Sequence, residues 1–451
     1  MRGSRLHHAP IIGLRPRAVL PVARGPTRME LTFVVRVRDV ITDAERRMNR
    51  PDTNSVRPYA FIVSFGVVSM LMDVVYQGAL AVQGPLLASL GANALVIGIV
   101  SGLGEATALG GRLFSGPLAD RSGRYWAFAI GGYATTALAV PAMGFVGSLV
   151  GVSALVIVER LGKSLRTPSR DTMISHAAAA VGRGKGFALH EVMDQIGAIG
   201  GPVAVSLLLG ATAGDYRVAL GVLIIPGLAA IGVLLVLRHR VPQPSVYEHV
   251  EADIASQEPG YSAAGHPKKR SALPRVFWLY CAGCATMLVG VATFGVISFH
   301  LVSTGLADDA FVPAIYAIAM AVDGAFAALT GVLYDKLGTR VLLCLPVVCA
   351  LIPLFAYAQS LALVIVGIML WGVSLGIQES TMRAAVADIV PTAHRATAYG
   401  FFSVSVGIGS LLGGVVAGVL YTISVPLLIV CVLAIEAAAL ALIVLALRSG
   451  S

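Results

Sequence analysis

Charged side chains are concentrated in one apolar segment, residues 147–170. Four of them are spaced 4, 3 and 4 residues apart, so in a helix they lie along one face: Glu159, Lys163, Arg166 and Arg170. Arg160 lies beside that face, and Pro168 is expected to bend the helix and release a carbonyl group. Because ionised groups are costly in an apolar environment, this face is expected to line a cavity or to meet opposite charges.

The following apolar segment, residues 186–211, carries His190, Glu191 and Asp194 within about one helical turn. Two opposed charged faces predict salt bridges that rearrange when a cavity opens. In an alternative interpretation, Arg166 and Arg170 are positive anchors at a membrane surface.

A carboxylate that is neutral in one conformation and ionised in another can carry a proton, since burial and a nearby cation act on it in opposite directions. In order of preference, the proton-coupling candidates are Asp73, Asp194, Glu105, Glu191 and Glu379. The side chains expected to line a substrate cavity are the polar and aromatic residues Tyr76, Gln77, Arg160, Lys163, Arg166, His190, Trp371, Gln378 and Arg383.

Two of these assignments have open alternatives. Glu379 and Arg383 are spaced for an intrahelical pair, so they are also interpreted as a neutral structural couple. Asp323 and Glu436 stand in apolar runs too, but the sequence indicates no partner for either.

The elements that must position these groups are membrane-spanning helices. Of the 451 residues, 57% are hydrophobic and only 13% are charged, and the mean hydropathy is +0.82. A soluble domain has about 25% charged residues. Apolar runs that span a bilayer need about 20 residues and must be helical, because lipid offers the backbone no hydrogen-bonding partner. Twelve such runs are expected, in two sets of six, near 59–80, 92–115, 125–145, 147–170, 186–211 and 216–238, and near 275–302, 310–332, 340–358, 361–386, 397–421 and 424–447.

The chain therefore divides into an arginine-rich tail (1–58), a six-helix bundle (59–238), a polar linker (239–274) and a second six-helix bundle (275–447). The tail is interpreted as disordered or as an over-extended start, with Met48 as the true first residue; a transit peptide is the alternative.

The placement of Lys and Arg predicts the orientation. Loops after even-numbered helices contain Arg121, Arg124, Arg183, Lys185, Lys336, Arg340 and Arg395, whereas loops after odd-numbered helices contain only Arg217. Positive loops stay in the cytoplasm, so both termini are expected there, in a multi-pass protein of the cell (inner) membrane. The orientation of the chain in the membrane explains the net charge of +9, and no nucleic-acid partner is expected.

One loop pattern occurs twice, 215 residues apart. The first copy contains Gly116, Asp120, Arg121, Gly123 and Arg124, and the second contains Gly331, Asp335, Lys336, Gly338 and Arg340. The pattern resembles the signature loop of the major facilitator superfamily. The resemblance implies two helical bundles that rock about a central cavity, with the substrate near the midplane. The stretches 102–105, 160–171 and 371–380 look like a prokaryotic permease branch of unassigned substrate.

The signature loop is expected to act as a gate in which Asp120 accepts hydrogen bonds and pairs with a neighbouring arginine, latching the two bundles in one state. The alternative is that Asp120, Arg121 and Arg124 only anchor helix ends at the lipid surface.

A second motif, Gly197 to Gly201 and Pro202, resembles the glycine-proline motif of drug/proton antiporters, although Val205 and Ser206 replace two glycines of that pattern. The alternative is close helix packing through small residues four apart, as at Gly409 and Gly413.

These features favour a proton-coupled secondary transporter that exports a small organic solute. The alternatives are uptake of an anionic solute and a non-transporting sensor or scaffold. No enzyme motif is present, and neither a cofactor nor a metal is expected, since Cys281 and Cys284 have no second pair to complete a zinc site. The expected partners are the lipid bilayer, the small-molecule substrate and protons, and the chain is expected to be a monomer.

Overall fold

The computed structural model describes residues 56–247 (apart from 180 and 182), 273–391 and 394–449. Most of the predicted tail and most of the predicted linker, including Met48, lie outside the described residues. The side chains of Arg183 and Lys185 also lie outside them.

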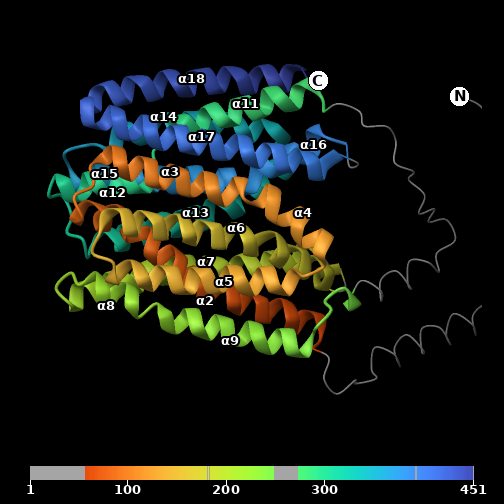
Figure 1. The fold of residues 1–451 in the computed structure, drawn as a ribbon. Coiled ribbons are helices and arrows are strands. Elements are labelled where there is room, and N and C mark those ends of the chain that lie inside the picture. The colour runs from red at the N-terminus through yellow and green to blue at the C-terminus, as the bar shows by residue number, and fades with distance from the viewer. Residues whose placement is uncertain (1–55, 180, 182, 248–272, 392–393, 450–451) are drawn as a thin grey trace, which may run out of the picture. The chain divides into compact units, whose positions relative to one another are not determined.

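The regular structure of the described residues is helical (Figure 1), as the need to satisfy backbone groups in lipid requires. The first half contains α2 (Pro58–Ser89), α3 (Ala94–Gly110), α4 (Arg112–Ser122), α5 (Tyr125–Phe145), α6 (Leu149–Ala179), α7 (Arg183–Ala211), α8 (Tyr216–Gly221) and α9 (Ile224–Arg240). The second half contains α11 (Arg275–Gly290), α12 (Phe294–Ser303), α13 (Val312–Leu337), η1 (Gly338–Leu343), α14 (Cys344–Ala356), α15 (Leu361–Ile377), η2 (Gln378–Met382), α16 (Arg383–Ile389), α17 (Arg395–Ile423) and α18 (Val425–Ser449).

Within the described ranges, ten stretches are long and apolar enough to cross a membrane. Helix α6 is not among them although it has 31 residues, because its charged residues lower its hydropathy. One of the ten, Val312–Ala356, contains both α13 and α14. If α6 is counted as a crossing and this stretch is divided between α13 and α14, the number equals the twelve crossings predicted from the sequence.

Three crossings expected as continuous helices are interrupted. Gly111 separates α3 from α4, and residues 291–293 separate α11 from α12. The third interruption is the π-helical turn η2 between α15 and α16. A π turn is rare and frequently marks a functional position, because it shifts the register of the side chains that follow.

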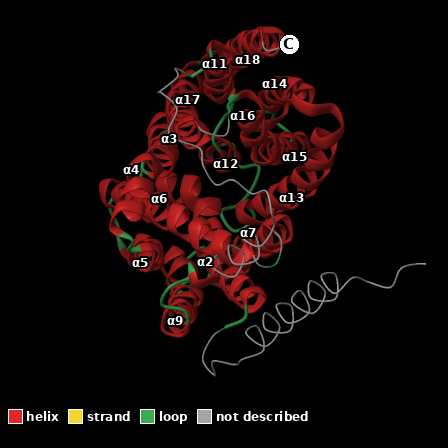
Figure 2. Cartoon of the chain, turned by 90° about the vertical axis from the view of Figure 1, so that its right-hand side faces the viewer, coloured by secondary structure: helices red, strands yellow, loops and turns green. Residues whose placement is uncertain are grey.

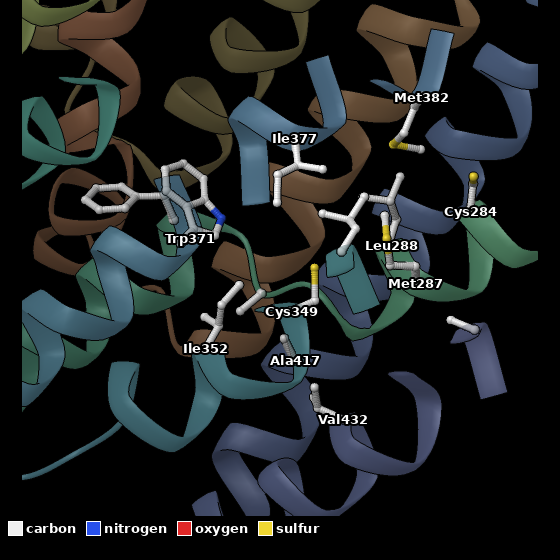
Figure 3. Packing of buried hydrophobic residues seen from close by; sticks show 14 of the residues in the cluster. Cys284, Met287, Leu288, Cys349, Ile352, Trp371, Ile377, Met382, Ala417 and Val432 are labelled. Carbon is white, nitrogen blue, oxygen red and sulfur yellow. The ribbon is translucent and has the colours of Figure 1, made fainter. Parts of the chain in front are cut away.

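The two halves have separate hydrophobic cores. The first core consists of buried residues between Phe61 and Tyr247, and the second is formed mainly by residues between Phe277 and Ala446. Figure 3 shows part of the second core, where Cys284, Met287 and Cys349 pack among aliphatic side chains. In the end-on view of Figure 2, α5, α6 and α9 lie together, apart from α11, α14 and α18.

The halves meet along two seams. In the first, α3 runs beside α17, and Gly98 and Gly414 allow the two backbones to touch. In the second, α7 lies against α13. Small residues permit such close approach between membrane helices.

We call the end of the described unit that carries residues 90–93, 212–215 and 304–311 the loop end, and the opposite end, with Pro58 and Ser449, the terminal end. At the loop end, Ser206 Oγ donates to the carbonyl oxygen of Ala310 at 2.6 Å, and the Tyr216 hydroxyl donates to Asp309 at 2.8 Å. These bonds join the first half to the second half at that end.

Candidate functional site

The interior of the first half is built around Arg160 of α6, which is only 2% exposed. Its guanidinium lies 3.4 Å from Glu105 of α3 and 3.6 Å from Glu159, and it donates to the hydroxyl of Tyr76 on α2. Arg166 lies 4.0 Å from the other oxygen of Glu159. A buried charge is tolerated when it is paired and hydrogen-bonded in this way.

Three cations surround the ring of Tyr76. The Lys163 ammonium lies 3.9 Å from the ring centroid, and the guanidinium carbons of Arg160 and Arg166 lie at 4.7 Å and 5.9 Å. Among the described residues, Lys163 makes no salt bridge, in contrast to Arg160 and Arg166. Lys163 is therefore a half-buried cation held mainly by the face of an aromatic ring.

A second charged cluster lies nearer the terminal end, between α6 and α7. Arg170 contacts Asp171 at 2.9 Å and Asp194 at 3.3 Å, and His190 lies 3.5 Å from Asp194. Ser69 of α2 completes the cluster, with Arg170 and His190 both 3.3 Å from its hydroxyl. The opposed faces predicted from the sequence are thus in contact.

The surface-anchor interpretation does not fit Arg166 or Arg170. Arg166 is 4% exposed and contacts Thr136 and the ring of Tyr133, and Arg170 faces α7. The helix continues to Ala179, so both residues lie further inside than the predicted end at residue 170 suggests.

Asp73 lies between the two clusters. It is half-buried on α2 and interacts electrostatically with Lys163, Arg166 and Arg170, although it makes no salt bridge within the described part of the chain. Asp194 in turn interacts with Asp73 and Arg170. The two carboxylates therefore share one cation, Arg170.

The second half contributes acidic groups. Asp323 of α13 is 4% exposed and interacts with Gln195 of α7, and one of its oxygens has no partner in the described structure. The side-chain amide of Gln195 donates to the backbone carbonyl of Met320, also on α13. Glu379, in the π turn, is exposed and interacts electrostatically with Glu191 and Lys163 across the interface. Asp323 also interacts with Glu379 and Glu191.

The predicted pair of Glu379 with Arg383 is wrong as an ion pair. Both side chains are exposed, and the described residues form no salt bridge between them, although their charges interact. The π turn spans Gln378–Met382, so the regular α-helical spacing of four residues does not hold there.

The other cavity candidates lie between the halves or in the second core. The hydroxyl of Tyr316 on α13 donates to Gln77 of α2 at 2.7 Å. Trp371 is only 7% exposed and packs against Tyr316 and Phe294, with ring centroids 5.9 Å and 5.6 Å away, so it belongs mainly to the second core. Gln378 is half-buried, and its amide nitrogen has no partner among the described residues.

The signature loops lie at the terminal end. Asp120 is exposed in the last turn of α4 and accepts from the hydroxyl of Tyr125 at 3.0 Å. Within the described residues it makes no salt bridge with Arg121 or Arg124, so the predicted arginine pair is absent in this conformation. Gly123 has a φ of 63°, and the corresponding Gly338 has a φ of 61°, which explains the glycine at both turns.

The members of the second signature loop are also at the surface. Asp335, Lys336 and Arg340 are exposed, and Gly116 and Gly331 are half-buried.

The glycines of the antiporter-like motif pack closely against α2. Gly197 lies against the backbone of Met70 and the Cβ of Asp73, and Gly201 lies against Val74. Pro202 is inside α7. Gly409 and Gly413 pack in the same way against α11.

Several residues of the site were not predicted from the sequence. Ser69, Tyr133 and Gln195 are common residue types in apolar segments, and their partners are distant in the chain. For Ser69 the signal was its position one turn before Asp73, on the same helix face.

No group of three or more His, Cys, Asp or Glu residues within the described residues is arranged to hold a metal ion. The five cysteines are free thiols.

Comparison with known proteins places this arrangement in a family. Residues 63–345 and 298–450 match the sequence profile of the Major Facilitator Superfamily. An uncharacterized protein of Mycobacterium tuberculosis is 48% identical over 382 residues, which cover 85% of this chain and 91% of the relative. An uncharacterized MFS-type transporter of Methanocaldococcus jannaschii is 25% identical, over 84% of this chain and 93% of its own length.

Solved structures share the fold at low identity. The nucleoside transporter NupG superposes with a TM-score of 0.66 at 14% identity, covering 86% of this chain and 99% of NupG. A bacterial homologue of the human lysosomal transporter Spinster, in an inward-facing and occupied conformation, gives 0.65 at 17% identity, over 87% and 98% of the two chains. A POT family transporter in complex with 5-aminolevulinic acid gives 0.64 at 11%, over 86% and 96%. The chain is a multi-pass membrane protein with the transporter fold, and it belongs to the major facilitator superfamily.

Proposed function

We propose that this secondary transporter couples the export of a small organic solute to protons by alternating access, through two six-helix halves. The observation that carries the proposal is the contact of Asp194 with Arg170 at 3.3 Å inside the first half, together with Asp73, which interacts electrostatically with both residues. A proton bound to one of two such carboxylates relieves the repulsion between them. After the proton is released, both carboxylates are ionised and are attracted by the cations of α6. A rearrangement of α2, α6 and α7 would therefore couple proton binding and release to the conformational change.

The terminal end is proposed to face the cytoplasm, on the basis of the Lys and Arg distribution. Hydrogen bonds between the halves lie at the loop end and in the middle, whereas Arg112 and Arg383 oppose one another with like charge nearer the terminal end. This pattern favours an inward-facing conformation, which is also the conformation of the Spinster homologue.

The proposed direction rests on the motif from Gly197 to Pro202. Its first glycine packs directly against Asp73, so movement of α7 along α2 would change the surroundings of the proposed proton carrier. Transport of a small organic solute is supported by the structural similarity to a nucleoside transporter and to a POT family transporter.

Uptake of an anionic solute is the second candidate, and Lys163 is the observation that favours it. Its ammonium group has no salt-bridge partner in the described structure and is half-buried beside Asp73. In that case Lys163→Ala would abolish movement of acidic solutes and leave cationic dyes unaffected.

The test is reconstitution of the full chain in liposomes that contain a pH-sensitive dye, with mixed pools of organic solutes. We expect solute-dependent proton flux that is lost in Asp73→Asn and retained in Asp308→Asn, an equivalent change at an exposed loop residue. Solute movement without proton flux would exclude proton coupling. Movement of neither would favour the sensor or scaffold alternative.

A further inference from the structure

Glu436 of α18 is a buried acid that the proposed transport cycle does not use. Its side chain is 2% exposed, and neither of its carboxylate oxygens has a hydrogen-bond partner among the described residues. No cation from the described part of the chain pairs with it. An ionised carboxylate in such a position is unfavourable unless a ligand supplies the missing positive charge.

The carboxylate of Glu436 lies against the interruption between α11 and α12. Gly290 is the last residue of α11, and α12 begins at Phe294. The atoms nearest to the position that a Cβ of Gly290 would take are Oε1, the carboxyl carbon and Cγ of Glu436. The carboxylate therefore occupies the space that the absent side chain of this glycine leaves free.

The interruption exposes further oxygen atoms that have no donor. The amide of Val291 donates to the carbonyl oxygen of Met287 at 3.2 Å, and the helical pattern stops there. Within the described structure the carbonyl oxygens of Val291 and Ala292 accept no backbone hydrogen bond, and the hydroxyl of Thr293 is buried without a partner. The C-terminal end of a helix also carries a partial negative charge, which favours a cation beside it.

The surroundings restrict the ligand to a small ion of single charge. Helix α18 packs against α11 and α14, and Met287, Cys349 and Val432 make this part of the second core apolar (Figure 3). One carboxylate balances one positive charge, so a divalent ion would leave an excess charge in an apolar environment. Carboxylate, carbonyl and hydroxyl oxygens are the ligands of hard metal cations.

We propose that Glu436 and the interruption between α11 and α12 form a binding site for sodium. The carboxylate supplies the negative charge, and the backbone oxygens of Val291 and Ala292 with the hydroxyl of Thr293 supply neutral ligands. Unwound carbonyl groups and helix C-terminal ends coordinate such ions in transporters with discontinuous helices. One acidic side chain is enough here, because the backbone contributes the other oxygens. This inference goes beyond the proposed function and does not depend on it.

Thermal unfolding of the full chain in detergent measures the binding. Sodium chloride replaces choline chloride stepwise at constant ionic strength and pH, so only the identity of the cation changes, and choline is too large for a buried site. Calcium chloride is compared in the same way. We expect sodium to raise the unfolding temperature by about 2 °C or more and to reach saturation, and we expect calcium to have no such effect.

Two variants locate the ion. Glu436→Gln removes the negative charge, keeps the size of the side chain and should abolish the rise with sodium. In sodium-free medium this variant should be at least as stable as the natural protein, because it has no uncompensated carboxylate. Gly290→Ala keeps the charge but places a methyl group where Oε1 lies, and it should also abolish the rise.

Each variant has a matched control. Asp73→Asn removes a carboxylate from α2 in the first half and should retain the rise. Gly110→Ala adds a methyl group that meets no other atom within 4 Å, and it should retain the rise as well.

The proposal is overturned if sodium and choline give equal unfolding temperatures, if only calcium stabilises the protein, or if Glu436→Gln retains the rise. Loss of the rise in Asp73→Asn with retention in Glu436→Gln would place the ion in the first half. Because unfolding involves no transport, sodium binding without proton flux in liposomes would overturn proton coupling alone. Proton flux without sodium binding would overturn the sodium site alone.

Discussion

Arg160 illustrates how a charge inside a membrane helix is stabilised by partners from several elements. Glu159 is adjacent in the sequence, but Glu105 and Tyr76 come from α3 and α2. Removal of one member of such a group leaves the others buried and unpaired, which costs about 3–5 kcal/mol.

We therefore expect Arg160→Ala to lower the thermal unfolding temperature strongly, because Glu159 is 4% exposed and loses its nearest cation. Tyr76→Phe removes one hydrogen bond and should cost about 1 kcal/mol. Thermal unfolding in detergent compares the two. Equal stability of both variants would show that the Arg160 group is not a stabilising network.

Glu436 of α18 is buried like Arg160, but it lacks the partners that stabilise Arg160. It is 2% exposed, neither of its carboxylate oxygens has a partner in the described structure, and it lies against Gly290 at the end of α11. A buried charge without a partner is destabilising. Glu436→Gln is therefore expected to be at least as stable as the natural protein when thermal unfolding is measured in sodium-free medium. A marked loss of stability would mean that the carboxylate has a required partner.

The sequence identified the charged residues of the site but few of their contacts. Spacing along α6 predicted a shared face for Lys163 and Arg166, because helical geometry is local. It did not predict that Tyr76 would lie beneath both side chains, or that Gln195 would donate to the carbonyl of Met320, because those contacts join distant segments.

At the scale of elements, glycines decide which helices touch. Gly98 of α3 and Gly414 of α17 face each other, and a Cβ added to either would overlap the backbone carbonyl of the other. Gly110, also in α3, has no other atom in the space that a Cβ would occupy. Glycine is therefore needed for close helix contact at position 98 but not at position 110.

Gly98→Ala is accordingly expected to separate α3 from α17 and to lower both stability and transport, whereas Gly110→Ala should leave both unchanged or slightly improved through helix propensity. The measurements are thermal unfolding and flux in liposomes. If Gly98→Ala behaves like Gly110→Ala, the seam is not closely packed in the functional protein.

At the scale of the whole described unit, the pattern of contacts between the halves defines the conformation. The loop end is joined by the bonds from Ser206 to Ala310 and from Tyr216 to Asp309, so alternating access requires that these contacts break.

Cysteines at positions 206 and 310 should form a disulfide under oxidation, because the Ser206 hydroxyl lies 2.6 Å from the backbone carbonyl oxygen of Ala310 and the two residues are therefore neighbours. The bond would hold the loop end closed, abolish transport in liposomes and be reversed by a reductant. The exposed Cys344 and the partly exposed Cys431 are replaced by serine in this background, and each single cysteine variant is the control. Full activity of the oxidised pair would mean that the loop end does not open.

The sequence by itself determined the membrane class, the twelve helical crossings and the duplicated signature loop, since each follows from local hydropathy or from a short motif. It also indicated which ionisable groups lie in apolar segments. Only the tertiary structure decided their partners: Arg166 is buried, Arg170 pairs with Asp194, and Lys163 lies over the ring of Tyr76, while Glu379 and Arg383 form no ion pair within the described residues. Those outcomes depend on how helices far apart in the chain approach one another, and no spacing within one segment encodes that distance.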